Sequence, residues 1–83
     1  MTQREKRHER IVNNPANVDF DDVKPWLRDF GFQLERIAGS HHVFRHPATK
    51  AKLNFQPERS GKAKAYQVKQ AIRLIESLNS GSK

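Results

Sequence analysis

Three of the four histidines of this chain lie within six consecutive positions, at His41, His42 and His46, directly after the pair Gly39-Ser40. Histidine both accepts and donates protons near neutral pH, so this cluster is a candidate site of acid–base chemistry. On a strand, His41 and His42 point to opposite faces, while His42 and His46 share a face but lie roughly 13 Å apart. No carboxylate of this segment is placed to complete a ligand set, so neither a metal site nor a cofactor is expected.

The charge of the chain narrows the class of partner. Its 83 residues include 16 Lys and Arg against 9 Asp and Glu, for a formal net charge of +7, and they include no cysteine. This excess favours a polyanion, and the lack of cysteine excludes disulfides, thiol catalysis and cysteine-ligated zinc. RNA suits a metal-free histidine because its 2′-hydroxyl is the nucleophile, so cleavage needs only a base, an acid and cations at the phosphate. The alternatives are a non-catalytic nucleic-acid-binding module, a domain that binds an acidic protein, and histidines without a chemical role.

Helical signals occur in three segments. Residues 3–12 predict a short helix that docks through its last two residues, with His8 in solvent. Asp19 is expected to cap a second helix that ends near residue 30, although Pro25 requires either a late start, with Asp21 or Asp22 as the cap, or a kink. Apolar residues at helical spacing predict the last helix over 62–78, before a disordered polar tail over 79–83.

Between these helices the pattern alternates, which predicts strands over 32–37, 41–46 and 52–56. A two-residue turn at Gly39-Ser40 joins the first two strands, so only one of His41 and His42 is expected to face a substrate. The turn predicts the following pairs on one side of the hairpin and then on the other: Ala38 with His41, Arg36 with Val43 and Leu34 with Arg45; Ile37 with His42, Glu35 with Phe44 and Gln33 with His46. The order of elements predicts a two-layer α+β domain with one face of the sheet open.

Basic residues of the last predicted helix form a stripe with one aromatic side chain. Lys62, Tyr66, Lys69 and Arg73 fall at i, i+4, i+7 and i+11, and Lys64 adds a cation in the first turn. Phosphates could line up along this stripe, although such a stripe is equally typical of a solvated face.

The hairpin and its flanks resemble the HicA family of toxins from bacterial toxin–antitoxin pairs. The resemblance rests on Gly31-Phe32, on the run from Gly39-Ser40-His41 to Pro47 and on a helix that begins near Gly61-Lys62, and it covers about residues 18–78. It implies a fold like a double-stranded-RNA-binding domain, cleavage of mRNA without the ribosome, and a HicB-type antitoxin that covers the active site. The family's catalytic histidine falls on His41, with His42 as the runner-up.

The expected organisation is then an N-terminal extension over 1–17, a HicA-like domain over 18–78 and the tail. In an endoribonuclease, Arg36, Arg45, Lys62, Lys64, Lys69 and Arg73 would hold the RNA backbone, and Ser40 would orient His41 or donate to a phosphate oxygen. The alternative is an RNA-binding module of the same fold that does not cleave. No apolar stretch approaches the roughly 20 residues of a membrane span, and no signal-peptide core follows the charged start, so a cytoplasmic protein is expected.

Overall fold

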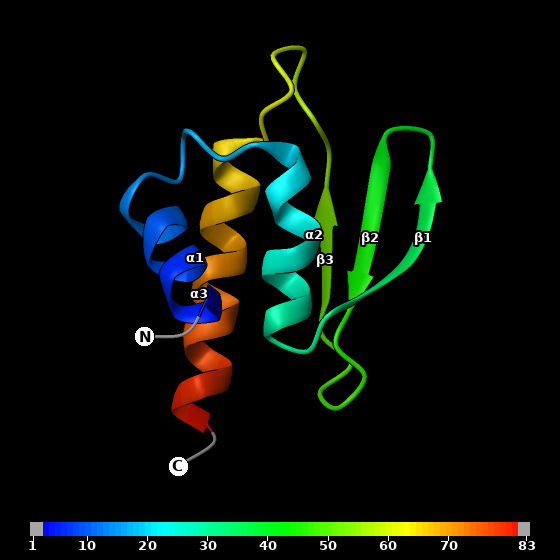
Figure 1. The fold of residues 1–83 in the computed structure, drawn as a ribbon. Coiled ribbons are helices and arrows are strands. Elements are labelled where there is room, and N and C mark those ends of the chain that lie inside the picture. Colours follow the sequence, from blue (N-terminus) through cyan, green and yellow to red (C-terminus); the bar gives the residue numbers. More distant parts are fainter. Residues whose placement is uncertain (1–2, 82–83) are drawn as a thin grey trace.

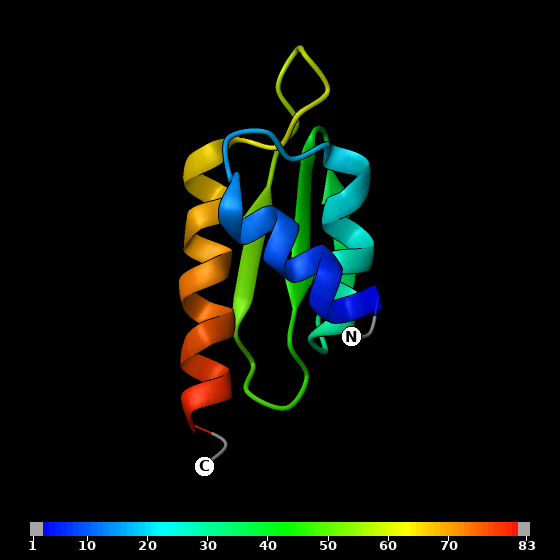
Figure 2. The same ribbon diagram turned by 60° about the vertical axis from the view of Figure 1, so that its left-hand side comes forward.

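A computed structural model describes residues 3–81 of the chain, and the side chains of residues 3–78. The order of elements is α1 (Gln3–Asn13), α2 (Phe20–Asp29), β1 (Gln33–Ala38), β2 (His41–Arg45), β3 (Lys52–Phe55) and α3 (Ala65–Gly81). The strands form an antiparallel sheet in the order β1-β2-β3, with α2 and α3 on one face (Figure 1). This arrangement confirms the predicted α+β fold like a double-stranded-RNA-binding domain, and α1 lies over α2 and α3 on the side away from the sheet (Figure 2).

One hydrophobic core lies between the sheet and the helices. Trp26 and Leu27 of α2, Phe55 of β3 and Val68 of α3 are 0% exposed. The ring of Phe44 from β2 packs edge-on against Phe55, with ring centroids 6.0 Å apart. Burial of such large side chains holds the two layers together, and it fixes which face of each strand remains in solvent.

The turn between β1 and β2 has the predicted geometry. Gly39 adopts a φ of 61°, which glycine tolerates at the first position of a two-residue turn. Ala38 pairs with His41 and Ile37 pairs with His42, as predicted. The two histidines therefore lie on opposite faces of the sheet.

The predicted pair of Arg36 with Val43 is also confirmed, but beyond it the predicted register is wrong, because β1 contains a β-bulge between Leu34 and Arg36. Leu34 pairs with Phe44 and not with Arg45, so neither Glu35 with Phe44 nor Gln33 with His46 is paired as predicted. The extra residue allows Leu34 to pack against the core beside the buried Phe44. Strict alternation would have turned Leu34 toward solvent.

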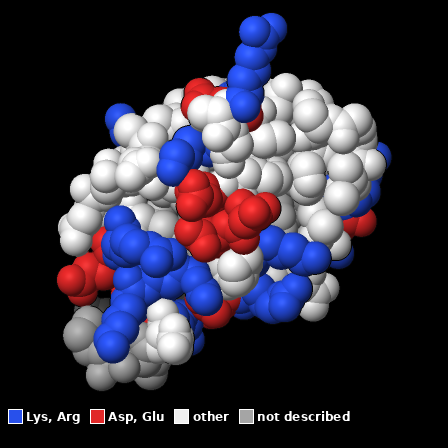
Figure 3. All heavy atoms as spheres, turned by 45° about the horizontal axis from the view of Figure 1, so that its top comes forward, with Lys and Arg blue, Asp and Glu red and all other residues white. Residues whose placement is uncertain are grey.

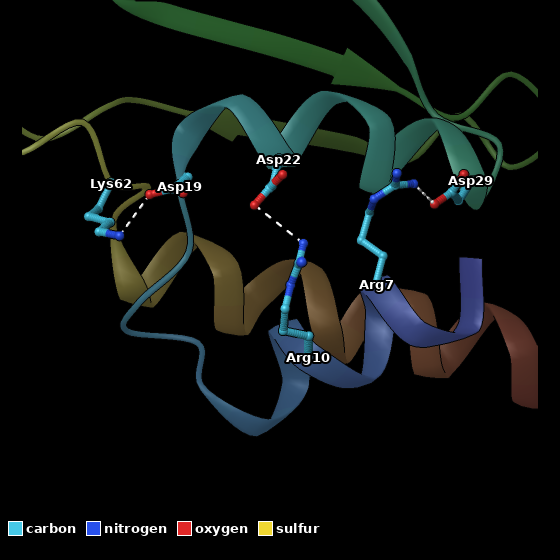
Figure 4. Close-up of polar contacts among 6 residues, drawn as sticks. All are labelled: Arg7, Arg10, Asp19, Asp22, Asp29 and Lys62. Carbon is cyan, nitrogen blue, oxygen red and sulfur yellow. Dashed lines mark hydrogen bonds and ion pairs between the residues drawn. The ribbon is translucent and has the colours of Figure 1, made fainter. Parts of the chain in front are cut away.

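Helix α2 begins at Phe20 with Pro25 inside it, so the alternative of a late start with Asp21 or Asp22 as the cap is wrong. Proline removes only one backbone donor, the one that would bond to the carbonyl of Asp21. Asp19 occupies the N-cap position without a side-chain bond to the helix, and its carboxylate accepts a hydrogen bond from Lys62 Nζ at 2.7 Å (Figure 4). This ammonium lowers the pKa of Asp19.

Helix α3 begins at Ala65, three residues later than predicted, because the preceding segment pairs with the chain before α2. Lys62 forms an isolated bridge with Asp19, and the Ala63 N–H donates to the Val18 carbonyl at 2.8 Å. Lys62 and Lys64 therefore do not lie on the helix. At its other end α3 reaches Gly81, so residues 79–81 of the expected tail are helical, and residues 82–83 lie outside the described part of the chain.

Helix α1 is fixed to α2 by packing and by ion pairs. The prediction that His8 lies in solvent is wrong, because His8 Nδ1 accepts a hydrogen bond from the Trp26 indole at 3.1 Å. Burial lowers the pKa of His8, and the nearby Glu76 carboxylate offsets part of that effect. Arg7 and Arg10 of α1 pair with Asp29 and Asp22 of α2, respectively (Figure 4).

Candidate functional site

The fold separates the three histidines of the hairpin. His41 is exposed at the start of β2, on the face of the sheet away from the helices, which we call the open face. His42 is half-buried on the helix side, with its ring edge-on to Phe20 at 4.8 Å between centroids. His46 follows β2 and packs edge-on against Phe32 at 5.1 Å. His42 and His46 thus pack against aromatic rings of the helix side, and His41 is the most exposed of the three.

Asn54 of β3 is the side chain that contacts His41. Its Oδ1 lies 3.4 Å from His41 Nδ1, which makes a long and weak hydrogen bond. An amide oxygen only accepts, so with the amide in this orientation the contact places a proton on Nδ1 and leaves Nε2 as the basic nitrogen. Asn54 is itself exposed on the open face, because its neighbours in β3, Leu53 and Phe55, are buried.

A chain of hydrogen bonds links the turn beside His41 to the start of α3. Gln56 Nε2 donates to Ser40 Oγ at 3.1 Å, and Lys64 Nζ donates to Gln56 Oε1 at 3.1 Å. The backbone N–H of Gln56 donates to Oε1 of the buried Gln67 at 2.8 Å. Ser40 Oγ is therefore bonded to Gln56, while the Ser40 carbonyl lies 3.1 Å from His42 Nδ1. The structure thus brings Ser40, His41 and Lys64 to one end of the sheet.

The arginines of the hairpin lie farther along the open face. Arg36 is exposed and pairs in register with Val43, two residues from His41. Arg45 is four residues from His41 along β2, which is about 13 Å. Its guanidinium lies 3.9 Å from the Glu35 carboxylate, whose other oxygen lies 3.6 Å from Lys52 Nζ. Arg45 is thus held in a charge cluster at the other end of the strand.

The predicted basic stripe shortens to the part that lies on α3. Tyr66, Lys69 and Arg73 are exposed at helical spacing, so they share one face of α3. Lys62 leaves this stripe because it pairs with Asp19. Figure 3 shows acidic side chains gathered over the start of α2, with Lys and Arg side chains beside them. Lys62 therefore borders the acidic surface.

Asn54 and Gln56 were not predicted from the sequence as site residues. The alternation of the third predicted strand does indicate that both side chains lie on the polar face, away from the apolar Leu53 and Phe55. Their relation to His41 depends on the pairing of β2 with β3, where His42 faces Phe55. That register brings the polar face of β3 beside His41. The register cannot be predicted from the spacing of residues within a single strand.

Two features are absent from the described residues. Within residues 3–81, no group of three or more His, Cys, Asp or Glu side chains is placed to hold a metal ion. Within the same residues, no helix has the length and apolar character needed to span a bilayer.

Comparison with known proteins gives one family. Residues 20–76 match the family model described as the HicA toxin of bacterial toxin-antitoxin, and this segment is more than half of the chain. It contains the hairpin with His41, Asn54 of β3, Gln56 directly after β3, and most of α3. No curated protein and no solved structure matches the chain significantly. The match agrees with the resemblance seen in the sequence, and the chain therefore belongs to the HicA family of toxins from bacterial toxin–antitoxin pairs.

Proposed function

We propose that this HicA-family toxin is an endoribonuclease that cleaves mRNA without a metal ion, with His41 as the general base. The observation that carries the proposal is the position of His41, which is the exposed histidine of the hairpin. Its Nδ1 contacts the side-chain amide oxygen of Asn54, so its Nε2 is left for a substrate. An exposed base on a surface without a helix over it suits a long polymeric substrate, which needs access along its whole backbone.

In the proposed reaction, His41 Nε2 takes the proton of an RNA 2′-hydroxyl. The resulting oxygen attacks the adjacent phosphorus and the bond from phosphorus to the 5′ oxygen breaks, so the products carry a 2′,3′-cyclic phosphate and, after protonation by water, a 5′-hydroxyl. The phosphate gains negative charge during attack, which a fixed cation stabilises. Lys64 is the candidate for this role, because Gln56 ties its ammonium to the turn beside His41.

The other proposed RNA contacts follow from where the cations lie. Arg36 and Ser40 belong to the hairpin on the side of His41, and Lys69 and Arg73 belong to the exposed face of α3. Arg45 and Lys62 are engaged with Glu35 and Asp19, respectively, so they would have to leave these carboxylates to bind phosphate.

The proposed partners of this toxin are an antitoxin protein and RNA. Membership of the family implies an antitoxin, and we propose that it is of the HicB type and covers the open face around His41. A second candidate function is RNA binding without cleavage, which the exposed stripe of Tyr66, Lys69 and Arg73 favours. In that case RNA binding would weaken with salt, and it would survive the loss of the His41 imidazole.

Growth on induction of the toxin tests the proposal. Wild type is expected to stop growth, and His41→Ala is expected to be harmless at equal protein level. Lys24→Ala is the control, because it removes an exposed cation of α2 outside the proposed site and should remain toxic. Undiminished toxicity of His41→Ala would overturn the catalytic role and favour the second candidate function.

A further inference from the structure

Tyr66 is unusual among the aromatic side chains of this protein. Its side chain is 59% exposed. The six phenylalanine and tryptophan side chains of the chain are instead buried in the core or partly buried against it: Phe20, Trp26, Phe30, Phe32, Phe44 and Phe55. Tyr66 therefore contributes little to the core, and a single ring in solvent calls for no explanation unless its surroundings favour a ligand.

Those surroundings connect Tyr66 to the proposed site. It lies in the first turn of α3, two residues after Lys64. Gln67 Nε2 donates to the Tyr66 hydroxyl at 3.5 Å, and Gln67 Oε1 accepts the Gln56 N–H at 2.8 Å. Because Gln56 is also bonded to Lys64 and to Ser40, the ring lies at the same edge of the molecule as the turn that carries His41.

Cations continue from Tyr66 along α3. Lys69 and Arg73 are exposed one and two turns farther along, on the face of Tyr66. The three side chains span about 10 Å of helix. An aromatic ring followed by cations on one exposed surface is the arrangement that binds single-stranded nucleic acid, because the ring stacks on a base and the cations hold the phosphates.

The geometry of cleavage favours a nucleotide that is held out of a regular stack. Attack by a 2′-hydroxyl requires the attacking oxygen, the phosphorus and the leaving oxygen to lie in line, and the regular stack of an RNA duplex does not allow this alignment. The base of a nucleotide held out of the stack loses its stacking contacts. An exposed aromatic ring beside the phosphate site can replace them.

We propose that Tyr66 stacks on one unpaired RNA base next to the phosphate on which His41 acts, so that the protein selects single-stranded RNA over duplex RNA. This inference rests on the proposed function for the identity of the nucleic acid and extends it to the state of the strand.

Binding of a short unstructured RNA by the full chain tests the inference, with His41→Ala in every protein to prevent cleavage. Tyr66→Leu is expected to weaken binding by roughly 5- to 150-fold, which is the range that loss of one stacked base gives. Tyr66→Phe should bind like the parent. Ile37→Ala is the matched control, because Ile37 is the other large exposed apolar side chain of the described residues, at 56%, and it should have no effect.

Two probes separate stacking from charge. An RNA of equal length without bases, and the same RNA paired with its complement, should both bind Tyr66→Leu and its parent equally. Since the chain contains one tyrosine, 3-fluorotyrosine labelling gives a single fluorine resonance, which should move on addition of single-stranded RNA but not of the baseless strand.

Equal binding of single-stranded RNA by Tyr66→Leu and its parent would overturn the stacking role, while cleavage by protein with His41 intact would leave the proposed function standing. Conversely, Tyr66-dependent binding by a protein that never cleaves would support stacking and overturn the nuclease. If RNA binds to none of the proteins, both are wrong.

Discussion

Replacing Asn54 by aspartate places a negative charge beside His41. The amide oxygen lies 3.4 Å from His41 Nδ1, and the substitution exchanges an amide for a carboxylate of nearly the same shape. The carboxylate favours the protonated imidazole. If His41 acts as a base, a higher pH is then needed to generate its active form, so the acid limb of the pH–rate profile should move upward.

The size of the shift follows from the distance. Two unit charges 3.4 Å apart in water interact by about 1.2 kcal/mol, and 1.36 kcal/mol corresponds to one pH unit. Both side chains are exposed, and salt near 0.15 M screens charges over about 8 Å, so part of this energy is lost. We therefore expect an upward shift of about 0.5 to 1 pH unit, which is smaller at higher salt.

The assay is single-turnover cleavage of a fluorescent RNA across pH by wild type, Asn54→Asp and Gln33→Glu. Gln33→Glu adds the same charge at the other end of the hairpin, where Gln33 pairs with Arg45. That position is four residues or about 13 Å along β2 from His41, which is beyond the screening length. Equal profiles for the two variants would refute the role assigned to the contact between Asn54 and His41.

Two further predictions concern the fold. Because burial lowers the pKa of His8, the unfolded chain binds that proton more tightly, so stability is expected to fall as the pH drops below the ordinary pKa of 6.5. His8→Gln, whose amide accepts from Trp26 without titrating, should lose less stability in thermal melts between about pH 7.5 and about pH 5, and an equal loss would contradict the assignment. Gly31→Ala, at a φ of 91°, would place its Cβ 2.8 Å from His46 Nε2, whereas Gly39→Ala, at a φ of 61°, meets no atom within 4 Å. Gly31→Ala should therefore cost about 1–3 kcal/mol in urea unfolding and more than Gly39→Ala, and equal costs would show that the contact with His46 carries no penalty.

The sequence was sufficient to predict the order of the elements and the turn, because local signals determine both. Alternation marks β3, and Gly39 supplies the positive φ that the turn requires. The turn then determines which residues pair next to it, and these pairs place His41 and His42 on opposite faces of the sheet. This separation reduced three histidines to one exposed candidate.

The features that were mispredicted depend on contacts between distant segments. The bulge exists because Leu34 packs into a core that the helices complete, and nothing in the residues of β1 alone requires it. Lys62 is held by Asp19, 43 residues earlier in the chain, and His8 is bonded to Trp26, 18 residues later. Such pairings override local helical spacing and local polarity, which are the two signals that the predictions used.

The most direct test of the central claim is the chemistry of the RNA ends left by purified protein in excess EDTA. We predict a 2′,3′-cyclic phosphate on one product and a 5′-hydroxyl on the other, and no cleavage where a single 2′-deoxynucleotide occupies the cut site. His41→Gln should lower the rate by about 10²-fold or more, as loss of a general base does. Cleavage at the wild-type rate by His41→Gln, or 5′-phosphate ends, would contradict a mechanism in which His41 activates the 2′-hydroxyl.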